Sequence, residues 1–141
     1  PYTILFRGCS FLIAYEGGVF SALRKLAPDI MKSAYRIYGS SSGSAVATVG
    51  LCGCDMGKGY RFLFLLCLKR WTYFLSHLKP ILWGLIPGGR VQRLIRDILE
   101  KFLPPNAHEL VSGKLHIVLT RLHDWRNVTV SEFASREELI Q

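Results

Sequence analysis

The chain has 141 residues, half of them hydrophobic, which allows one domain with its own core and excludes an intrinsically disordered chain. The net charge is +8, and most of it comes from residues 57–101, which hold nine Lys and Arg residues against two Asp and Glu residues. The chain begins at Pro1 without a methionine and ends at Gln141 inside a predicted helix. We therefore expect it to be a piece of a longer protein.

The cysteines indicate free thiols rather than a disulfide framework. Cys52 and Cys54 are too close in sequence for an easy bridge, and with Cys9 and Cys67 the total is lower than small disulfide scaffolds usually have. No pair of His or Cys residues has the spacing of a zinc site. We expect an intracellular chain that holds no metal and no cofactor.

The first half of the chain alternates between short apolar runs and helical patterns. Its periodicity predicts a buried strand at 2–6, a helix at 11–26, a strand at 34–38 and a helix of small residues at 42–51. This order is typical of a parallel sheet with helical crossovers.

The helix predicted at 11–26 is expected to bury one face and to pack closely against another element. Gly17 and Gly18 each weaken a helix by about 1 kcal/mol relative to alanine, so we expect them to allow a close approach. Apolar side chains recur at helical spacing and are expected to face the core: Phe11, Tyr15, Val19, Ala22, Leu23 and Leu26.

The second half predicts further helices and one hairpin. Residues 57–89 are predicted to be helical with breaks at Pro80 and Pro87, and residues 90–102 form an amphipathic helical pattern. The remaining predicted elements are a short helix with a capping box at Asn106 and Glu109, strands at 114–122 and 127–133 joined by a turn at 123–126, and a last helix capped by Ser135 and Glu138.

The turn before the helix at 42–51 carries the pattern G-x-S-x-G, as Gly39-Ser40-Ser41-Ser42-Gly43. In a nucleophile elbow, a strand runs into a helix through a strained turn, and the flanking positions must be small because neighbouring backbone crowds them. The N-terminus of the helix then favours negative charge at the reacting centre. This context predicts Ser41 as a nucleophile, with Gly39 and Gly43 as the glycines of the elbow. The alternative is a flexible loop rich in Gly and Ser.

A nucleophilic serine also needs an oxyanion hole and a base. The backbone N–H groups of Gly8, Cys9 and Ser10 are the candidate oxyanion donors, because they follow the first strand and open a helix. No histidine is expected to be the base. The four histidines fall in helical stretches, a strand and a turn, and we interpret them as structural: His77, His108, His116 and His123.

Beyond these features, the chain resembles the patatin-like phospholipase domain family, in the branch of adiponutrin and adipose triglyceride lipase. The similarity covers nearly the whole chain and is weakest at residues 57–89. It is carried by FRGCSFLIAY (6–15), LRKLAPDI (23–30), RIYGSSSG (36–43), FLPPNAHELVSGKLHIVLTRL (102–122) and NVTVSEFASREELI (127–140).

The resemblance implies an α/β fold, with a patatin-like three-layer αβα arrangement around a mainly parallel central sheet. Residues 1–141 would form a partial domain that is incomplete at the C-terminus. Residues 57–101 would be a variable, basic and apolar helical region within it.

The resemblance also implies a lipid acyl-ester hydrolase, of the triacylglycerol lipase or phospholipase A type, that uses a Ser-Asp dyad. Ser41 would be the nucleophile, and an aspartate in a D-G-[GA] motif would be the base. No aspartate of this chain is followed by glycine, so the catalytic Asp is expected outside it and the chain alone is expected to be inactive: Asp29, Asp55, Asp97 and Asp124.

Two positions depart from the family pattern, which has glycine where this chain has Ser10 and Ile13. Serine in a left-handed conformation costs about 1 kcal/mol or more, and Ile13 adds bulk near the mouth of the site. The alternatives are therefore a catalytically weak or inactive regulatory protein that binds lipid droplets or membranes, and a lipid transacylase.

Residues 57–101 have two interpretations of their own, a core helix with a solvated basic face or a contact with a lipid surface. No nucleic-acid-binding module is recognisable, so no nucleic acid is expected. The expected partners are an acylglycerol or phospholipid substrate, a lipid-droplet or membrane surface and a lipase cofactor protein. The expected location is intracellular, cytoplasmic and peripheral on lipid droplets or membranes.

Overall fold

The computed structural model describes residues 2–8, 12–55, 57–58 and 90–141. Most of the predicted basic, apolar region lies outside the described residues, as do Cys9 and Ser10. In chain order the elements are β1 (Tyr2–Phe6), α1 (Ile13–Leu26), α2 (Pro28–Ser33), β2 (Ala34–Gly39), α3 (Ser42–Leu51), α6 (Arg90–Phe102), α7 (Ala107–Val111), β3 (Leu115–Thr120), β4 (Asn127–Val130) and α8 (Arg136–Ile140). In the described parts of the chain, no helix is both long and apolar enough to cross a bilayer.

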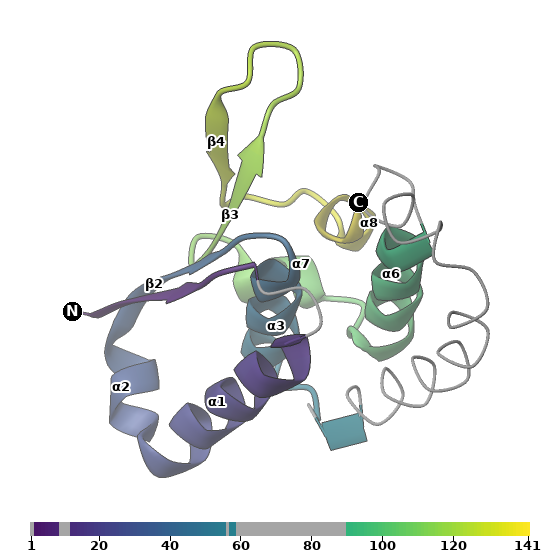
Figure 1. The fold of residues 1–141 in the computed structure, drawn as a ribbon. Helices are drawn as coiled ribbons and strands as arrows, with labels where there is room; N and C mark the ends of the chain where they lie inside the picture. Colours follow the sequence, from purple (N-terminus) through teal and green to yellow (C-terminus); the bar gives the residue numbers. More distant parts are fainter. Residues whose placement is uncertain (1, 9–11, 56, 59–89) are drawn as a thin grey trace.

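The centre of the described fold is a four-stranded sheet in the order β1-β2-β3-β4 (Figure 1). The first three strands are parallel, and β4 pairs antiparallel with β3 as the second arm of a hairpin. The register places Phe6 beside Gly39 and Gly39 beside Ile117. The predicted α/β class is confirmed as a mostly parallel sheet with flanking helices, and the carboxyl ends of β1, β2 and β3 lie at the same edge.

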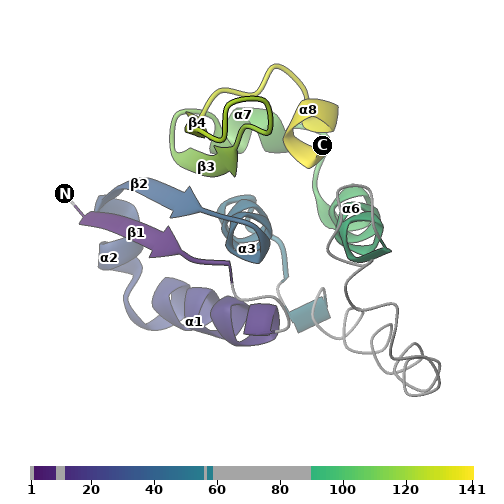
Figure 2. The ribbon, with the colours of Figure 1, turned by 45° about the horizontal axis from the view of Figure 1, so that its top comes forward.

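The helix α3 lies at the centre of the packing. It contacts α1, α6, α7 and the three parallel strands, and Figure 2 shows it nearly end-on between β2 and α6. A helix surrounded in this way must be apolar or small on all sides. Its buried residues are accordingly small: Ser42, Gly43, Ala45, Val46, Ala47, Thr48 and Gly50.

The first strand is not buried as the sequence predicts. Phe6 is buried, but Thr3 is exposed and Leu5 is 65% exposed. β1 is the end strand of the described sheet, and alternate side chains of a strand point to opposite faces. Phe6 points to the face that α1 covers, where its ring lies 5.3 Å from that of Phe20 between centroids. An apolar run alone does not reveal that one of its faces lacks a cover.

The helix α1 also buries a different face from the predicted one. Its buried residues are Gly17 and Phe20, while Leu26, which was expected in the core, is 84% exposed. Apolar residues occur around much of this helix, so their spacing does not select a single face. Contact with α3 determines which face of α1 is buried, because Phe20 fills the space beside Gly50.

The close packing of another element that was expected at Gly18 does not occur there. A Cβ atom at Gly18 would meet no atom within 4 Å. A Cβ atom at Gly50 would stand 2.3 to 2.6 Å from three atoms of the Phe20 ring. Glycine is required on α3, at the point where α1 crosses it.

Of the two predicted capping boxes, one is confirmed. At α8, Ser135 Oγ accepts a hydrogen bond from the Glu138 backbone N–H at 3.1 Å, and the Glu138 carboxylate accepts one from the Ala134 N–H. At α7, the side chain of Asn106 makes no cap hydrogen bond, so that prediction is wrong. The reason is local, because Ser135 has the extended backbone that a cap requires, whereas Asn106, at φ −94° and ψ 20°, does not.

We expect Gly50→Ala to lower the free energy of unfolding by about 1–3 kcal/mol, because Phe20 is fully buried and cannot move aside. Gly18→Ala is the matched control in α1 and is expected to raise the free energy of unfolding by about 0.5–1 kcal/mol. Urea denaturation of each variant measures the two effects. Equal effects of the two substitutions would contradict this account of the packing.

Candidate active site

The turn between β2 and α3 holds Ser41 in a backbone conformation that is rare for a residue with a side chain. Ser41 has φ 52° and ψ −126°, and it is exposed. β2 ends at Gly39, and α3 begins at Ser42. Non-glycine residues in such conformations are uncommon and cluster at functional sites. The strand, tight turn and helix that a nucleophile elbow requires are therefore present around Ser41.

The two glycines of the G-x-S-x-G pattern lie where the backbone crowds them. A Cβ atom at Gly43 would stand 2.3 Å from the carbonyl oxygen of Phe6, at the end of β1. A Cβ atom at Gly39 would stand 2.5 Å from the Cα atom of Ser44. Real Cβ atoms do not approach backbone this closely, so both positions require glycine. The steric reason that the sequence pattern suggests is present at Gly39 and Gly43.

The loop after β1 lies directly against the turn. The Gly8 N–H donates a hydrogen bond to Ser40 Oγ at 3.1 Å, and the Ser40 N–H donates to the Phe6 carbonyl oxygen at 3.1 Å. A Cβ atom at Gly8 would stand 2.9 Å from the Cβ atom of Ser41 and 3.6 Å from its Oγ atom. The structure thus brings Gly8 beside Ser41. The other two predicted oxyanion donors, Cys9 and Ser10, lie outside the described residues.

The first turn of α3 supports the backbone of Ser41 from the other side. The Ser44 hydroxyl donates a hydrogen bond to the Ser41 carbonyl oxygen, which also accepts one from the Ser44 N–H at 3.0 Å. No acidic residue occupies this first turn. The N-terminus of a helix carries a partial positive charge, so a developing negative charge beside Ser41 would be stabilised.

Ser40 and Ser44 are two residues of the site to which the sequence analysis gave no role. Ser40 joins the turn to the loop after β1, and Ser44 joins it to α3. The sequence feature that could have pointed to these two roles is the number of serines around the G-x-S-x-G motif. A short hydroxyl side chain can bond to nearby backbone in a crowded turn where a longer side chain would not fit.

The described histidines contact other groups, and His77 lies outside the described residues. The ring of His116 stacks on Tyr38, with 4.9 Å between the centroids. Burial, and then the charge of Arg36, lower the pKa of His116. The other two histidines lie beside carboxylates: His108 Nε2 is 4.0 Å from Glu109 Oε1, and His123 Nδ1 is 3.5 Å from Asp124 Oδ1.

The described cysteines are poor candidates for a nucleophile. Cys52 and Cys54 are both free thiols, as the sequence predicts, and both are partly buried. Burial, with a smaller contribution from Cys54, raises the pKa of the Cys52 thiol to about 12. The nucleophilic form of cysteine is the thiolate, which this environment disfavours at neutral pH. Within the same described ranges, no three His, Cys, Asp or Glu residues are placed to hold a metal ion.

Comparison with known proteins gives the following matches. The family model described as patatin-like phospholipase matches residues 4–141. The human omega-hydroxyceramide transacylase is 38% identical over 141 residues, and the human patatin-like phospholipase domain-containing protein 2 is 40% identical over 141 residues. The mouse 1-acylglycerol-3-phosphate O-acyltransferase Pnpla3 is 34% identical over 139 residues.

These matches cover 99–100% of this chain but 25%, 26% and 32% of the three relatives, in the order given. The chain therefore spans between a quarter and a third of the length of these proteins. No solved structure matches it.

We expect Ser41→Gly to raise the free energy of unfolding by about 1–2 kcal/mol, because glycine adopts this backbone conformation without strain. Ser41→Ala keeps a Cβ atom and is the matched control, with an expected change near zero. Thermal or urea denaturation of the two variants gives the comparison. A Ser41→Gly protein that is less stable than the Ser41→Ala protein would show that the turn is not strained.

We expect His116 to make stability depend on pH on the acid side. Its pKa is lowered in the fold from an ordinary value of 6.5, so the unfolded chain binds the proton more readily. This contribution to stability is present above pH 6.5, the pKa of histidine in the unfolded chain. It is lost as the pH falls through the lower pKa that His116 has in the folded protein. His116→Phe keeps the stacking on Tyr38 and should reduce the loss, as measured by urea denaturation across this range. An unchanged pH profile in the variant would contradict this role.

Proposed function

The chain belongs to the patatin-like phospholipase family, and from this premise we propose that it supplies the nucleophile of a lipid acyl-ester hydrolase or transacylase. The family relatives include proteins named as a transacylase, an acyltransferase and a phospholipase-domain protein. The observation that supports the proposal most directly is the positive φ angle of Ser41 at the junction of β2 and α3. Such strain persists only where surrounding structure imposes it, and it is typical of a nucleophile elbow.

In the proposed reaction, Ser41 Oγ forms a bond to the carbonyl carbon of a lipid ester as a base takes the hydroxyl proton. The carbonyl oxygen becomes an oxyanion, which the N-terminus of α3 stabilises. The tetrahedral intermediate collapses, the C–O bond to the alcohol breaks, and the alcohol leaves with a proton. Water then attacks the acyl-serine in a hydrolase, whereas the hydroxyl group of a second lipid attacks it in a transacylase.

We assign the base to an aspartate outside these 141 residues, as part of a Ser-Asp dyad. No aspartate in the chain is followed by the glycine of the D-G-[GA] pattern, and the described histidines are engaged with other groups. Since the relatives are about three to four times as long as this chain, they have room for such a segment. This assignment comes from the family resemblance.

The substrate class sets the proposed location. Acylglycerols and phospholipids gather in droplets and bilayers, so the whole protein would act at a lipid-droplet or membrane surface inside the cell. A lipase cofactor protein is a further partner that this function suggests.

A catalytically weak or inactive lipid-binding protein is the second candidate function, and one contact favours it. The Gly8 N–H, a predicted oxyanion donor, is already bonded to Ser40 Oγ. A donor that is held in this way stabilises an oxyanion only after Ser40 turns away. Ile13, in contrast, does not argue for this candidate, because it is partly buried and packs against the hydrophobic core.

We expect a fluorophosphonate probe to label Ser41 in the full-length protein, because the probe reacts with activated serine hydroxyls. Ser41→Ala should abolish the label and lower lipid-ester hydrolysis or acyl transfer at least about 10³-fold. Peptide mapping by mass spectrometry locates the label, and assays with triacylglycerol and phospholipid substrates measure turnover.

Ser33→Ala is the control for this experiment, because Ser33 is an exposed serine at the end of α2. It should label and turn over like the unsubstituted protein. A folded full-length protein that takes no label and shows no turnover would reject the catalytic proposal in favour of the second candidate.

A further inference from the structure

The β3–β4 hairpin extends away from the body of the fold (Figure 1). We call residues 121–126, which connect its two strands, the hairpin tip. Two large apolar side chains of the tip face solvent, with Leu122 66% exposed and Trp125 76% exposed. Leu119, the residue before the last of β3, is 49% exposed. Adjacent exposed side chains of this size mark an interaction site more often than single ones do.

Trp125 occupies a conformation that bulky residues rarely adopt, with φ 57°. Glycine or asparagine is the usual residue at such a position in a turn. A tryptophan there gains little burial in the described fold to offset its strained backbone, since it is 76% exposed. Strain of this kind is typical of a functional position.

The tip is held in shape by one carboxylate. Asp124 accepts hydrogen bonds from the guanidinium group of Arg121 and from the Arg126 backbone N–H, the latter at 3.3 Å. Two backbone hydrogen bonds close the loop as well. The Arg121 N–H donates to the Arg126 carbonyl oxygen at 2.9 Å, and the Trp125 N–H donates to the Arg121 carbonyl oxygen at 2.8 Å. The exposed indole is thus presented by an ordered turn.

The direction of β3 relates the tip to the candidate nucleophile. Ile117 pairs with Gly39, the last residue of β2, and β3 continues beyond it to Thr120 before the tip begins. Because β2 and β3 are parallel, the hairpin passes the same edge of the sheet at which Ser41 lies. A surface that touches the tip would therefore lie beyond the edge of the sheet that carries Ser41 and would face it (Figure 1).

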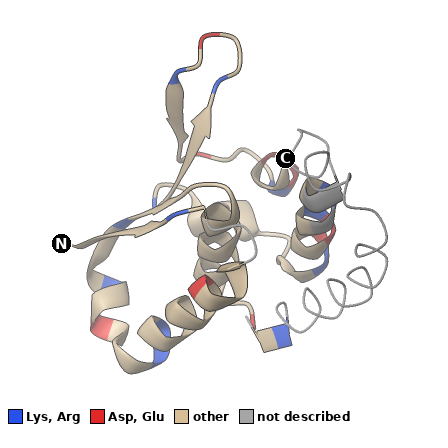
Figure 3. Cartoon of the chain, in the orientation of Figure 1, with Lys and Arg blue, Asp and Glu red and all other residues tan. Residues whose placement is uncertain are grey.

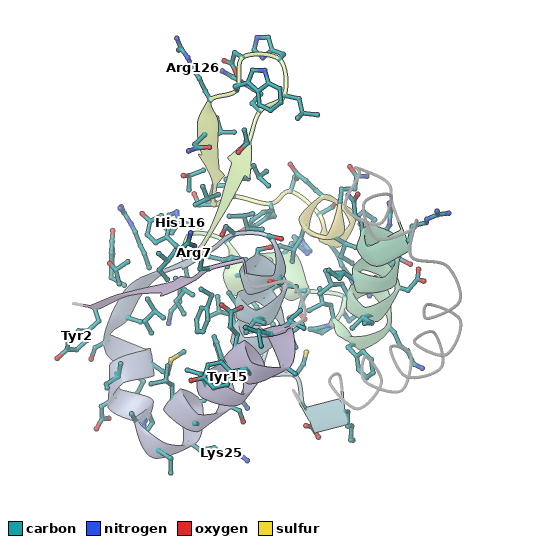
Figure 4. The ribbon with its side chains drawn as sticks, in the orientation of Figure 1. Tyr2, Arg7, Tyr15, Lys25, His116 and Arg126 are labelled. Carbon is teal, nitrogen blue, oxygen red and sulfur yellow. The ribbon has the colours of Figure 1, made fainter. Side chains whose placement is uncertain are left out.

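The charge around the tip is basic. Arg121 is paired with Asp124, while the guanidinium of Arg126 is largely exposed and only reaches Asp124 at 4.0 Å. Figure 3 shows basic positions on both arms of the hairpin and an acidic position at its end, and Figure 4 shows Arg126 pointing away from the hairpin. An exposed tryptophan and leucine beside an exposed arginine complement an interface of acyl chains and anionic headgroups.

We propose that the hairpin tip inserts into the surface of an anionic phospholipid layer, with Leu122 and Trp125 among the acyl chains and Arg126 at the negatively charged headgroups. The inference rests on the proposed function, since it orients the edge that carries Ser41 toward its lipid substrate. A protein partner fits less well. A stable protein interface buries about 1,200–2,000 Å² in total, which a narrow turn with two apolar side chains does not provide.

The test is co-sedimentation of the full-length protein with vesicles of phosphatidylcholine, with and without phosphatidylserine. Trp125→Ala and Leu122→Ala should each weaken binding to both kinds of vesicle by about tenfold. Leu26→Ala is the matched control, because Leu26 is an exposed leucine at the end of α1, and it should leave binding unchanged.

The charged contact is tested in the same way. Arg126→Ala should weaken binding only to the vesicles that contain phosphatidylserine, and Lys25→Ala, at an exposed lysine of α1, should not. If the hairpin serves a protein partner, all the tip variants will bind vesicles like the unsubstituted protein, and the inference is overturned.

Trp125→Gly separates loss of the side chain from loss of the fold. Glycine relieves the positive φ angle, so this variant should unfold at an equal or higher temperature while it binds vesicles about tenfold more weakly. A lower unfolding temperature would overturn the argument from strain.

A failure of this inference can be told apart from a failure of the proposed function. Binding is measured in the Ser41→Ala background as well, where no turnover is expected, and the same losses should appear there. Tip variants that bind vesicles normally in both backgrounds reject the inference about the tip. The proposed function is then judged separately, by fluorophosphonate labelling of Ser41.

Discussion

The carbonyl group at the end of β1 lies against the α-carbon of Gly43, in the first turn of α3. This contact leaves no room for a side chain, and it sets the distance between the sheet and the helix that follows β2. The chain must then pass from Gly39 to Ser42 within a single tight turn. Ser41 takes up the resulting strain, with its positive φ angle, and is left exposed at the edge of the sheet. The hydrogen bonds of Ser40 and Ser44 hold the turn from both sides.

The turn can keep this geometry because α3 is fixed on every side. Its small residues allow α1 to approach until the Phe20 ring fills the space beside Gly50, while α6 and α7 pack on other sides. Interiors packed this closely resist small displacements. Strain of about 1–3 kcal/mol at one residue is tolerated when the surrounding packing determines its backbone. The packing of the buried core around α3 therefore maintains the backbone conformation of the exposed Ser41.

The parallel direction of the strands brings three segments of the chain to one edge of the sheet. The carboxyl ends of β1, β2 and β3 all point to it, so the loop after β1, the Ser41 turn and the hairpin tip follow from the same topology. The positive φ angles among described residues other than glycine belong to Ser41 and Trp125, one in the turn and one in the tip. In the proposed function, the first residue performs the chemistry and the second brings the lipid surface to it.

The sequence by itself determined the order of the strands, the G-x-S-x-G turn and the bounds of α3 and α6, because these depend on neighbouring residues, but it did not predict α2 as a separate helix. It did not determine the buried face of α1, the exposure of β1 or the contact between Gly8 and Ser40. Those depend on which elements meet, and Gly50 and Phe20 are far apart in the chain. The crowding of the Ser41 turn by β1 and the loop after it likewise depends on a distant segment. Local patterns specify strands, helices and turns, whereas the crowding that shapes the candidate site exists only once distant segments pack together.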